Sequence, residues 1–549
     1  MSTPTRGAIG SLLALLRPFR TIVIGSVALG MAGGLAITLL LATINTALHT
    51  DTGLTQTVVL SFAGLCLLAL SSSIVSDIGT NKVGQRIIAR LRKELGEKVL
   101  SAPIEQLERH PKHRLIPVLT HDIDTISDFS FAFTPLAISL TVTLGCLGYM
   151  AYLSLPMFLL TVVAIAIGTS IQYVARSRGI KGLYAARDQE DELQKHYTAI
   201  AAGAKELRIN RERRRYLNEQ GIQRTADLIC DTQIRAVNTF ILAKSFGSML
   251  FFVVIGLALA LQAYWPSAQP AAMSGFVLVL LYMKGPLEHL VSTLPVVSRA
   301  QIAFRRIAEL SEQFSSPEPY LLLDGPTPRR HELHTLELRN VRYDFPQVQG
   351  SERFSLGPVN LTIRQGEIVF IVGENGCGKT TLIKLLLGLY SPQQGEIRVD
   401  GQAVHAHDRD EYRQLFTTIF ADYYLFDQLP QHDRPVPESA NHYLKRLEIA
   451  HKVSIRDGAF STTDLSTGQR KRLALLSAWL EERPVLVFDE WAADQDPSFR
   501  RVFYTELLPD LKRLGKTIIV ISHDDRYFDI ADQLIRMRAG QVLSCEAVA

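Results

Sequence analysis

Residues 373–380 read Gly-Glu-Asn-Gly-Cys-Gly-Lys-Thr and fit the pattern G-x-x-x-x-G-K-[ST]. An apolar segment that predicts a strand, 368–372, precedes them, and an apolar segment that predicts a helix, 382–387, follows. Glycines let backbone N–H groups surround phosphate oxygens, and the start of a helix adds a favourable dipole. We therefore predict a phosphate-binding loop made by Gly373, Glu374, Asn375, Gly376, Cys377, Gly378, Lys379, Thr380 and Thr381.

Three side chains of this loop have separate expected roles. Lys379 should reach the β- and γ-phosphates of a nucleotide, and the Thr380 hydroxyl should ligate Mg²⁺. We interpret Cys377 as a small side chain that fills the loop, and we expect it to make the protein sensitive to thiol reagents.

Two carboxylates follow a second apolar segment. Residues 485–490 read Val-Leu-Val-Phe-Asp-Glu, which predicts a buried strand with Asp489 and Glu490 at its carboxyl end. Open α/β sheets bind ligands at that end of their strands. Asp489, 110 residues after Lys379, is the expected second partner of Mg²⁺. Glu490 is expected to orient or deprotonate an attacking water molecule.

A third segment, 465–469, reads Leu-Ser-Thr-Gly-Gln and precedes a predicted helix. Ser466, Thr467 and Gly468 are suited to cap that helix. Their chemistry alone leaves an ordinary helix cap and a ligand-binding turn equally open.

Four segments without any charged residue predict membrane-spanning helices, which would attach the phosphate-binding part of the chain to a membrane. They are 21–48, 54–76, 129–175 and 245–283, with 28, 23, 47 and 39 residues. A helix needs about 20 residues to cross the hydrocarbon core, so the two longer segments each hold a pair. Six spans are expected, at about 19–48, 54–76, 129–153, 156–176, 240–264 and 271–292.

The basic residues predict the orientation of these spans. The segment 77–128 contains nine Lys and Arg residues and 176–235 contains thirteen, whereas 49–53, 154–156 and 265–270 contain none. Basic loops stay on the cytoplasmic side, so both termini are expected to be cytoplasmic. The two basic segments read as helices that continue below the membrane. The net charge of +4 argues against a nucleic-acid partner.

The fold class expected from these patterns is an all-α membrane domain followed by an α/β phosphate-loop domain. The membrane domain is expected at 1–312, a Ser- and Pro-containing linker at 313–333, and the α/β domain at 334–549. At the inner end of the sixth span, Lys284 and Glu288 share a helix face. They are either an internal ion pair or a polar contact for a transported molecule.

The three motifs together resemble the ATP-binding cassette of ABC transporters, and six spans before one cassette resemble the exporters of that family. The resemblance implies ATP and Mg²⁺ as ligands. It places Ser466, Gly468 and Gln469 on ATP held by a second subunit, although Thr467 stands where the family commonly has Gly. It makes Glu490 the catalytic base, and it makes His523, after an apolar strand, the switch histidine.

The same resemblance assigns further positions. Asp496 matches an acidic position of the family's D-loop, and Phe345 matches the aromatic residue that stacks on adenine, with Tyr343 as the alternative. The family's Q-loop glutamine is replaced in 419–425, where Asp422 is the candidate contact for metal or water. Contacts between the long helices and a cassette are expected near 103–110 and 205–211.

One cassette per chain implies a homodimer in the bacterial inner membrane, in contact with lipid. Trp491 within 488–497, together with 420–426 and 522–525, resembles the cyclic-peptide and siderophore exporters of the family, including exporters of pyoverdine precursors. The implied cargo is a peptide-type small molecule, moved to the periplasm, where accessory proteins are possible partners. Export of a lipid or a hydrophobic drug, and a membrane-anchored regulatory ATPase, are the alternatives.

Overall fold

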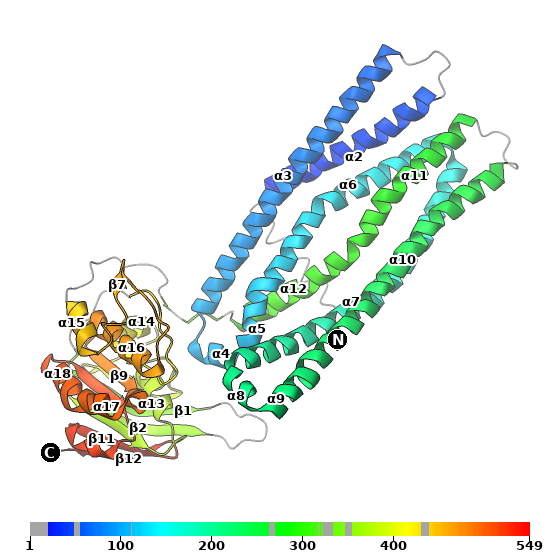
Figure 1. Cartoon of the computed structure of the whole chain (residues 1–549). Coiled ribbons are helices and arrows are strands. Elements are labelled where there is room, and N and C mark those ends of the chain that lie inside the picture. The colour runs from blue at the N-terminus through cyan, green and yellow to red at the C-terminus, as the bar shows by residue number, and fades with distance from the viewer. Residues whose placement is uncertain are drawn as a thin grey trace. The chain divides into compact units, whose positions relative to one another are not determined.

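The computed structural model describes residues 20–48, 55–110, 112–262, 270–314, 316–318, 320–321, 333–345, 354–429 and 439–548. The predicted loops at 49–53 and 265–269 and most of the predicted linker lie outside these ranges. The chain forms two compact units (Figure 1). The first comprises 1–100 and 108–315, and the second comprises 101–107 and 316–549.

Helices build the first unit, and among its described residues six helices are long and apolar enough to cross a membrane, as predicted. The long elements are α2 (Arg20–Leu48), α3 (Gln56–Leu100), α6 (Ile123–Leu153), α7 (Leu155–Ala202), α10 (Arg224–Gln262), α11 (Pro270–Ser292) and α12 (Leu294–Gln313). The short elements are α5 (Lys112–Pro117), η2 (Val118–Asp122), α8 (Ala204–Ile209), α9 (Arg211–Tyr216) and η3 (Leu217–Gln223). A further short helix, α4 (Ile104–Arg109), begins in the second unit and ends in the first.

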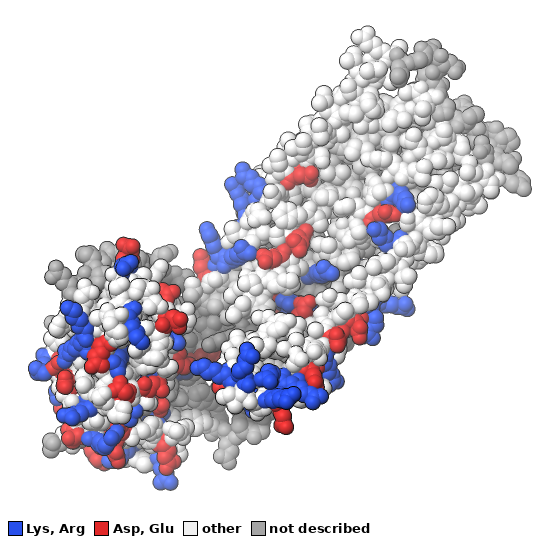
Figure 2. Space-filling model, viewed as in Figure 1, with Lys and Arg blue, Asp and Glu red and all other residues white. Residues whose placement is uncertain are grey.

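The helices of the first unit are longer than a bilayer requires. α7 has 48 residues, which at 1.5 Å per residue is about 72 Å, against a hydrocarbon core of about 30 Å. The predicted continuation of the spans into long helices is therefore present. Ser154, in an extended conformation, separates α6 from α7 where a turn was predicted. On the face shown in Figure 2, charged side chains cover the lower ends of these helices and leave the upper parts uncharged.

Two sheets form the frame of the second unit. Six strands lie in the order β12-β11-β3-β10-β9-β6, parallel except for β12, and four antiparallel strands lie in the order β2-β1-β4-β5. The strands are β1 (Thr335–Asp344), β2 (Ser355–Arg364), β3 (Ile368–Gly373), β4 (Gln394–Val399), β5 (Gln402–Ala403), β6 (Phe416–Ile419), β7 (Ile455–Arg456), β8 (Ala459–Phe460), β9 (Val485–Asp489), β10 (Thr517–Ile521), β11 (Gln533–Arg538) and β12 (Gln541–Ala547).

Helices cover both faces of the parallel sheet. They are α13 (Lys379–Leu386), α14 (Arg409–Arg413), α15 (Ser439–Arg446), α16 (Thr467–Glu481), η4 (Trp491–Asp494), α17 (Pro497–Val502), η5 (Phe503–Leu507), α18 (Leu508–Arg513) and η6 (Asp525–Ile530). Alternate residues of β3 enter opposite cores: Phe370 packs on one face of the sheet, and Val369 and Ile371 pack on the other. Burial on both faces explains why the central strands read as uninterrupted apolar segments in the sequence.

Residues 101–107 belong to the second unit. Ile104 packs against the core that contains β1, β2 and α13, and the Glu105 carboxylate accepts a hydrogen bond from the backbone N–H of Ser391 at 3.4 Å. A cassette contact was predicted near 103–110, and these two residues provide it. The other predicted segment, 205–211, lies in the first unit.

Candidate functional site

The phosphate loop lies between β3 and α13, as the sequence predicts. Gly376 and Gly378 have φ of 79° and 105°, a left-handed conformation that glycine adopts without strain. A Cβ on Gly378 would lie 2.9 Å from the Leu356 side chain, so space as well as conformation requires glycine there. Gly378 is also the N-cap of α13, which directs the positive end of that helix toward the loop.

Lys379 is held inside the loop that it serves. Its side chain is buried, and its Nζ donates hydrogen bonds to the carbonyl oxygens of Gly373 at 2.9 Å and Glu374 at 3.1 Å. The ammonium group therefore lies beside the loop backbone, where phosphate oxygens would be bound. Cys377 is buried in the same loop, which agrees with its interpretation as a small filler.

Thr380 and Asp489 meet at the carboxyl ends of β3 and β9. The Thr380 hydroxyl donates a hydrogen bond to Asp489 Oδ2 at 3.3 Å, and Asp489 Oδ1 is buried without a partner in the described part of the chain. Burial raises the pKa of Asp489, and the negative charge of Glu490 raises it further. The Thr380 hydrogen bond offsets part of this shift. A cation would stabilise the ionised carboxylate.

These two oxygen ligands fit Mg²⁺, which favours oxygen ligands and commonly takes one or two carboxylates together with phosphate oxygens. Within the described ranges, no group of three or more His, Cys, Asp or Glu side chains could hold a metal ion. Asp422 lies close enough for its charge to raise the pKa of Asp489. Its predicted contact with metal or water stays a prediction.

Glu490 and His523 come together from adjacent parallel strands. β9 and β10 are in register at Asp489 and Ile521, and the residues after them bring His523 Nε2 to 3.3 Å from Glu490 Oε1. Both side chains are partly exposed, at 38% for Glu490 and 46% for His523. They line a cleft of about 480 Å³, so a water molecule and a phosphate group can reach the carboxylate.

The backbone at Glu490 is itself unusual. Its φ is 51°, a left-handed conformation that is uncommon for a residue with a side chain. Its N–H donates a hydrogen bond to the carbonyl oxygen of Ile521 at 3.2 Å. Such backbone conformations concentrate at functional sites, where the surrounding structure holds them in place.

The aromatic candidates for adenine differ in burial. Tyr343 is 2% exposed and stacks on Tyr390, with 5.0 Å between ring centroids, so its face is already covered. Phe345 is only partly buried and contacts Tyr343 edge-on at 5.1 Å. Of the two rings, that of Phe345 is the less buried. The predicted stacking of Phe345 on adenine stays a prediction.

The segment that resembles the ABC signature starts α16. Ser466 is the N-cap of this helix, but its side chain makes no capping hydrogen bond, so the ordinary capping role considered for it is not seen. The Gly468 carbonyl oxygen accepts a hydrogen bond from Gln495 Nε2 at 3.1 Å, and Gln469 Oε1 accepts one from Lys452 at 3.2 Å. In the described ranges, no hydrogen bond or ion pair joins Ser466, Gly468 or Gln469 to the phosphate loop.

Two basic residues that were not predicted from the sequence connect α16 to the end of β9. Lys471 is 2% exposed, and its Nζ donates to the carbonyl oxygen of Glu490 at 3.1 Å and pairs with Asp494 at 2.7 Å. Arg472 donates to Gln495 at 3.0 Å and pairs with Asp496 at 2.5 Å. The only local signal was the run of three basic residues at 470–472, which also fits a solvated helix face.

Trp491 strengthens the same connection. It is fully buried, its Nε1–H donates to the Lys471 carbonyl oxygen at 3.0 Å, and its ring stacks on Phe503 with 4.3 Å between centroids. The Trp491 side chain therefore bonds to the backbone of Lys471, and the Lys471 side chain bonds to the backbone of Trp491. The residue that follows Glu490 is thereby fixed to α16.

Asp496 has a structural role in this chain. It is the N-cap of α17 and accepts a hydrogen bond from the Phe499 N–H at 2.9 Å. The hydrogen bond from Ser498 lowers the pKa of Asp496 most, followed by that from Phe499, and the charge of Arg472 adds to it. Its predicted contribution to ATP binding stays a prediction.

Comparisons with known proteins agree with the two units. Residues 356–493 match the ABC transporter family, and residues 21–215 match the ABC transporter transmembrane region. The chain is 36% identical over 528 residues to the ATP-binding protein SyrD of Pseudomonas syringae pv. syringae, covering 94% of this chain and 92% of the relative.

A more distant relative is the ATP-dependent lipid A-core flippase of Alkalilimnicola ehrlichii, 25% identical over 520 residues and covering 91% of this chain and 85% of the relative. The fold matches a bacterial Atm1-family ABC exporter solved with ATP bound. The TM-score is 0.75 at 18% identity, covering 97% of this chain and 96% of the solved one.

Proposed function

The chain belongs to the ABC transporter family, as an exporter half-transporter that couples ATP hydrolysis to transport, and we propose that it moves a peptide-type small molecule from cytoplasm to periplasm. Six apolar helices and the exporter relatives make it a multi-pass protein of the inner membrane. One observation carries the proposal. Thr380 bonds to Asp489, and Glu490 lies beside His523, at one sheet edge of a chain whose described part has six helices long and apolar enough to cross a membrane.

The mechanism proposed for ATP hydrolysis depends on positioning and electrostatics. Lys379 and the backbone of 373–380 hold the phosphates, and Phe345 supports the adenine ring. Bound Mg²⁺, held by Thr380 and Asp489, would neutralise charge on the phosphates. Glu490 orients and deprotonates the attacking water, and His523, 3.3 Å away, holds that carboxylate and senses the γ-phosphate.

Half-transporter exporters generally function as dimers, and we propose a homodimer with two-fold symmetry. The support within this chain is that Ser466, Gly468 and Gln469 make no bond to the phosphate loop in the described ranges. A second copy would place these residues on the ATP held by the first. Closure of the two cassettes on ATP would turn the membrane helices outward, and hydrolysis would reset them. We also propose that both termini are cytoplasmic, because the basic segments 77–128 and 176–235 are expected on the cytoplasmic side.

The proposed cargo is a cyclic peptide or a siderophore precursor of the pyoverdine type. Its support is the resemblance around Trp491, whose indole N–H donates a hydrogen bond to the Lys471 carbonyl oxygen. The identity of 36% to SyrD, against 25% to a lipid A-core flippase, argues against lipid A-core as the cargo. Lipid translocation stays the second candidate because flippases are among the relatives.

Transport by the full-length protein in sealed vesicles tests these proposals. Wild type should accumulate a pyoverdine-type peptide when ATP is added on the cassette side, and a Glu490→Gln variant should not. The same assay with a labelled lipid, and separately with a hydrophobic drug, measures whether the protein transports either alternative cargo. Preferential movement of the lipid would replace the cargo proposal. ATP hydrolysis without movement of any of the three would favour the regulatory ATPase.

A further inference from the structure

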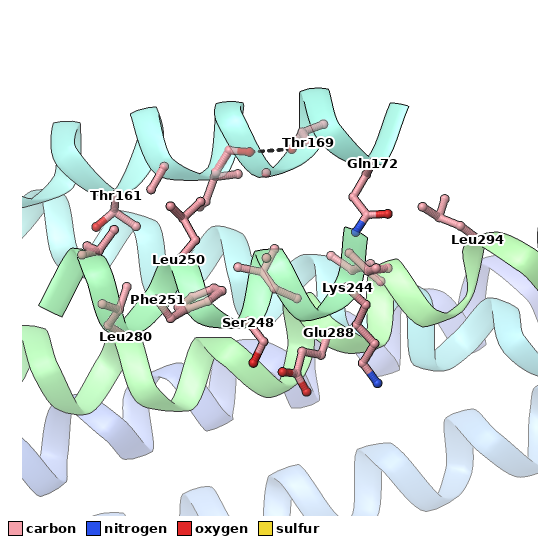
Figure 3. A pocket seen from close by; sticks show the side chains of 18 residues that line it. Thr161, Thr169, Gln172, Lys244, Ser248, Leu250, Phe251, Leu280, Glu288 and Leu294 are labelled. Atoms are coloured by element: carbon pink, nitrogen blue, oxygen red, sulfur yellow. Dashed lines mark hydrogen bonds between the residues drawn. The ribbon is translucent and has the colours of Figure 1, made fainter. Parts of the chain in front are cut away.

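Buried polar side chains beside two cavities differ in whether they have partners. In the first unit, a cavity of about 250 Å³ lies among α7, α10 and α11, and the Gln172 amide that lines it forms no hydrogen bond within the described part of the chain (Figure 3). Glu288 of the same lining lies 3.8 Å from Lys284, so the internal ion pair, one of the two alternatives for these residues, is present. Around the cleft of Glu490 and His523 in the cassette, by contrast, buried polar side chains are bonded to one another. Such bonds hold side chains in defined positions.

Ser522, directly before His523, fixes the backbone on both sides of that histidine. Its Oγ accepts a hydrogen bond from the backbone N–H of Asp524 at 3.0 Å, and this bond spans His523. Its own N–H donates to the carbonyl oxygen of Ile371 at 3.4 Å, on the strand that leads into the phosphate loop. A serine oxygen bonded to the N–H two residues further on forms a local turn. The orientation of the Ser522 side chain therefore helps to set the direction in which His523 leaves the sheet.

Tyr504 holds the Ser522 side chain. The Tyr504 hydroxyl lies 2.7 Å from Ser522 Oγ, and the two hydroxyls share a hydrogen bond. Tyr504 is 1% exposed, in the π-helical turn η5, and burial raises its pKa to about 12, so it keeps its proton near neutral pH. Its ring stacks on Tyr527 with 4.4 Å between centroids and lies 6.0 Å from the ring of Phe370. Packing against η6 and β3 thus fixes the hydroxyl in place.

Asp524 holds the other side of His523. Its carboxylate accepts hydrogen bonds from Arg526 at 2.7 and 2.8 Å, and these bonds lower the pKa of Asp524, so it stays ionised near neutral pH. Asp524 Oδ2 also lies 3.9 Å from Arg500, whose guanidinium donates to the carbonyl oxygen of Ala492 at 3.1 Å. The turn at His523 is therefore tied to the backbone that follows the proposed base.

Building on the proposed role of His523 in ATP hydrolysis, we propose that Tyr504 is a positioning residue for that histidine. Tyr504 acts through Ser522 Oγ, which sets the turn that keeps His523 Nε2 3.3 Å from Glu490 Oε1. Without the Tyr504 hydroxyl, the Ser522 side chain is free to rotate, and fewer molecules hold His523 beside the base. Hydrolysis then slows, whereas nucleotide binding persists because the phosphate loop holds the phosphates independently.

ATPase assays of the full-length protein in detergent, with Mg²⁺ and ATP, measure kcat and KM separately. Tyr504→Phe removes the hydroxyl and keeps the ring, so kcat should fall about fivefold with little change in KM. Tyr527→Phe is the matched control, because its ring stacks on Tyr504 but its hydroxyl forms no hydrogen bond with any other described residue. This control should keep the wild-type kcat. Both variants should bind a fluorescent ATP analogue with wild-type affinity, which shows that the nucleotide site is folded.

Double variants test whether Tyr504 acts through its neighbours. Ser522→Ala breaks the same connection and should lower kcat at least as much as Tyr504→Phe does. Adding Tyr504→Phe to Ser522→Ala should cause no further fall, because residues that act in one series of bonds are not additive. Adding Tyr504→Phe to His523→Ala should likewise leave the lowered kcat of that variant unchanged.

Four results would overturn the proposal: a wild-type kcat in Tyr504→Phe, an equal fall in Tyr527→Phe, a rise in KM in place of the fall in kcat, or additive losses in a double variant. Failure of the proposed site chemistry gives a different pattern. If His523→Ala keeps the wild-type kcat, the proposed role of His523 fails and its positioning by Tyr504 fails with it. If His523→Ala lowers kcat and Tyr504→Phe does not, only the positioning role is refuted.

Discussion

The membrane unit and the cassette unit satisfy buried polar groups in different ways. In the cassette, buried cations reach across elements: Lys471 bonds to the backbone at Glu490, and Arg472 bonds to Gln495. In the membrane unit, hydroxyls mostly bond within their own helix, as Thr38 does to the carbonyl oxygen of Gly34 and Thr143 to that of Ser139. Lipid offers no water to an unpaired group, so local satisfaction is the safest arrangement there.

The two units also pack differently. Cassette residues such as Leu385 and Phe370 are fully buried, whereas Leu67, on the membrane helix α3, is 67% exposed. Membrane helices meet instead at small residues, and a Cβ on Gly145 would lie 2.5 Å from the Thr38 hydroxyl. Water drives large apolar side chains into a core, but lipid does not, so close approach of backbones becomes the main source of helix packing.

The largest effect is expected at Glu490, the proposed catalytic base. Glu490→Gln keeps the size of the side chain but removes the base, so ATP turnover should fall by about 10²- to 10⁴-fold while nucleotide binding persists. Steady-state ATPase assays and binding of a fluorescent ATP analogue measure the two quantities. Turnover at the wild-type rate would show that Glu490 is not the base.

Replacing one leucine by alanine in each unit tests whether the buried leucines of the cassette stabilise the protein more than the exposed leucines of the membrane helices. Leu385→Ala leaves a cavity in the cassette core and should cost about 2–5 kcal/mol of stability. Leu67→Ala, in the lipid-exposed part of α3, should change stability by less than about 0.5 kcal/mol. Thermal unfolding in detergent followed by tryptophan fluorescence compares them. Similar losses would mean that Leu67 is covered in the assembled protein.

Two glycines of α6 test the packing of membrane helices. Gly145→Val would force its Cβ against Thr38 and should destabilise the helix bundle by about 1–3 kcal/mol. Gly148→Val, three residues on, has no atom within 4 Å of its Cβ and serves as the matched control. The measurement is the detergent concentration at which each variant aggregates. Equal behaviour of the two variants would contradict close packing at Gly145.

Trp491 tests the connection between α16 and the catalytic strand. Trp491→Phe keeps an aromatic ring but loses the hydrogen bond to the Lys471 carbonyl oxygen, a loss of about 1 kcal/mol. Because that bond helps to fix the residue after Glu490, kcat should fall a few-fold with little change in KM. Trp479→Phe, a tryptophan of α16 itself, is the control. An unchanged kcat would limit Trp491 to packing.

The smallest effect concerns pH and stability without nucleotide. The pKa of Asp489 is raised in the folded protein, mainly by burial and then by Glu490, so its ionised form disfavours folding above that pKa. Without nucleotide, Asp489→Asn should raise the melting temperature at neutral pH. The gain should shrink as the pH falls through the raised pKa, because wild-type Asp489 is then neutral too. A gain that is independent of pH would refute this explanation.

The sequence by itself determined the elements whose signals are continuous along the chain. The six spans follow from charge-free segments of sufficient length, and the phosphate loop follows from eight consecutive residues between a strand and a helix. Asp489 and Glu490 were predicted because they stand at the carboxyl end of an apolar strand, and parallel strands bring these ends to one edge. His523, which also follows an apolar strand, was assigned only through the family resemblance. These signals are local, so no knowledge of long-range contacts was needed.

Only the tertiary structure decided which distant side chains meet. Tyr343 and Phe345 are two residues apart, and burial of Tyr343 against Tyr390 distinguishes them. The Lys471 and Trp491 pair, and the unpartnered Gln172 in its cavity, carry no signature in the sequence. Such contacts join segments that are separate in the chain, and their geometry depends on how helices and strands pack, which residue order alone does not specify.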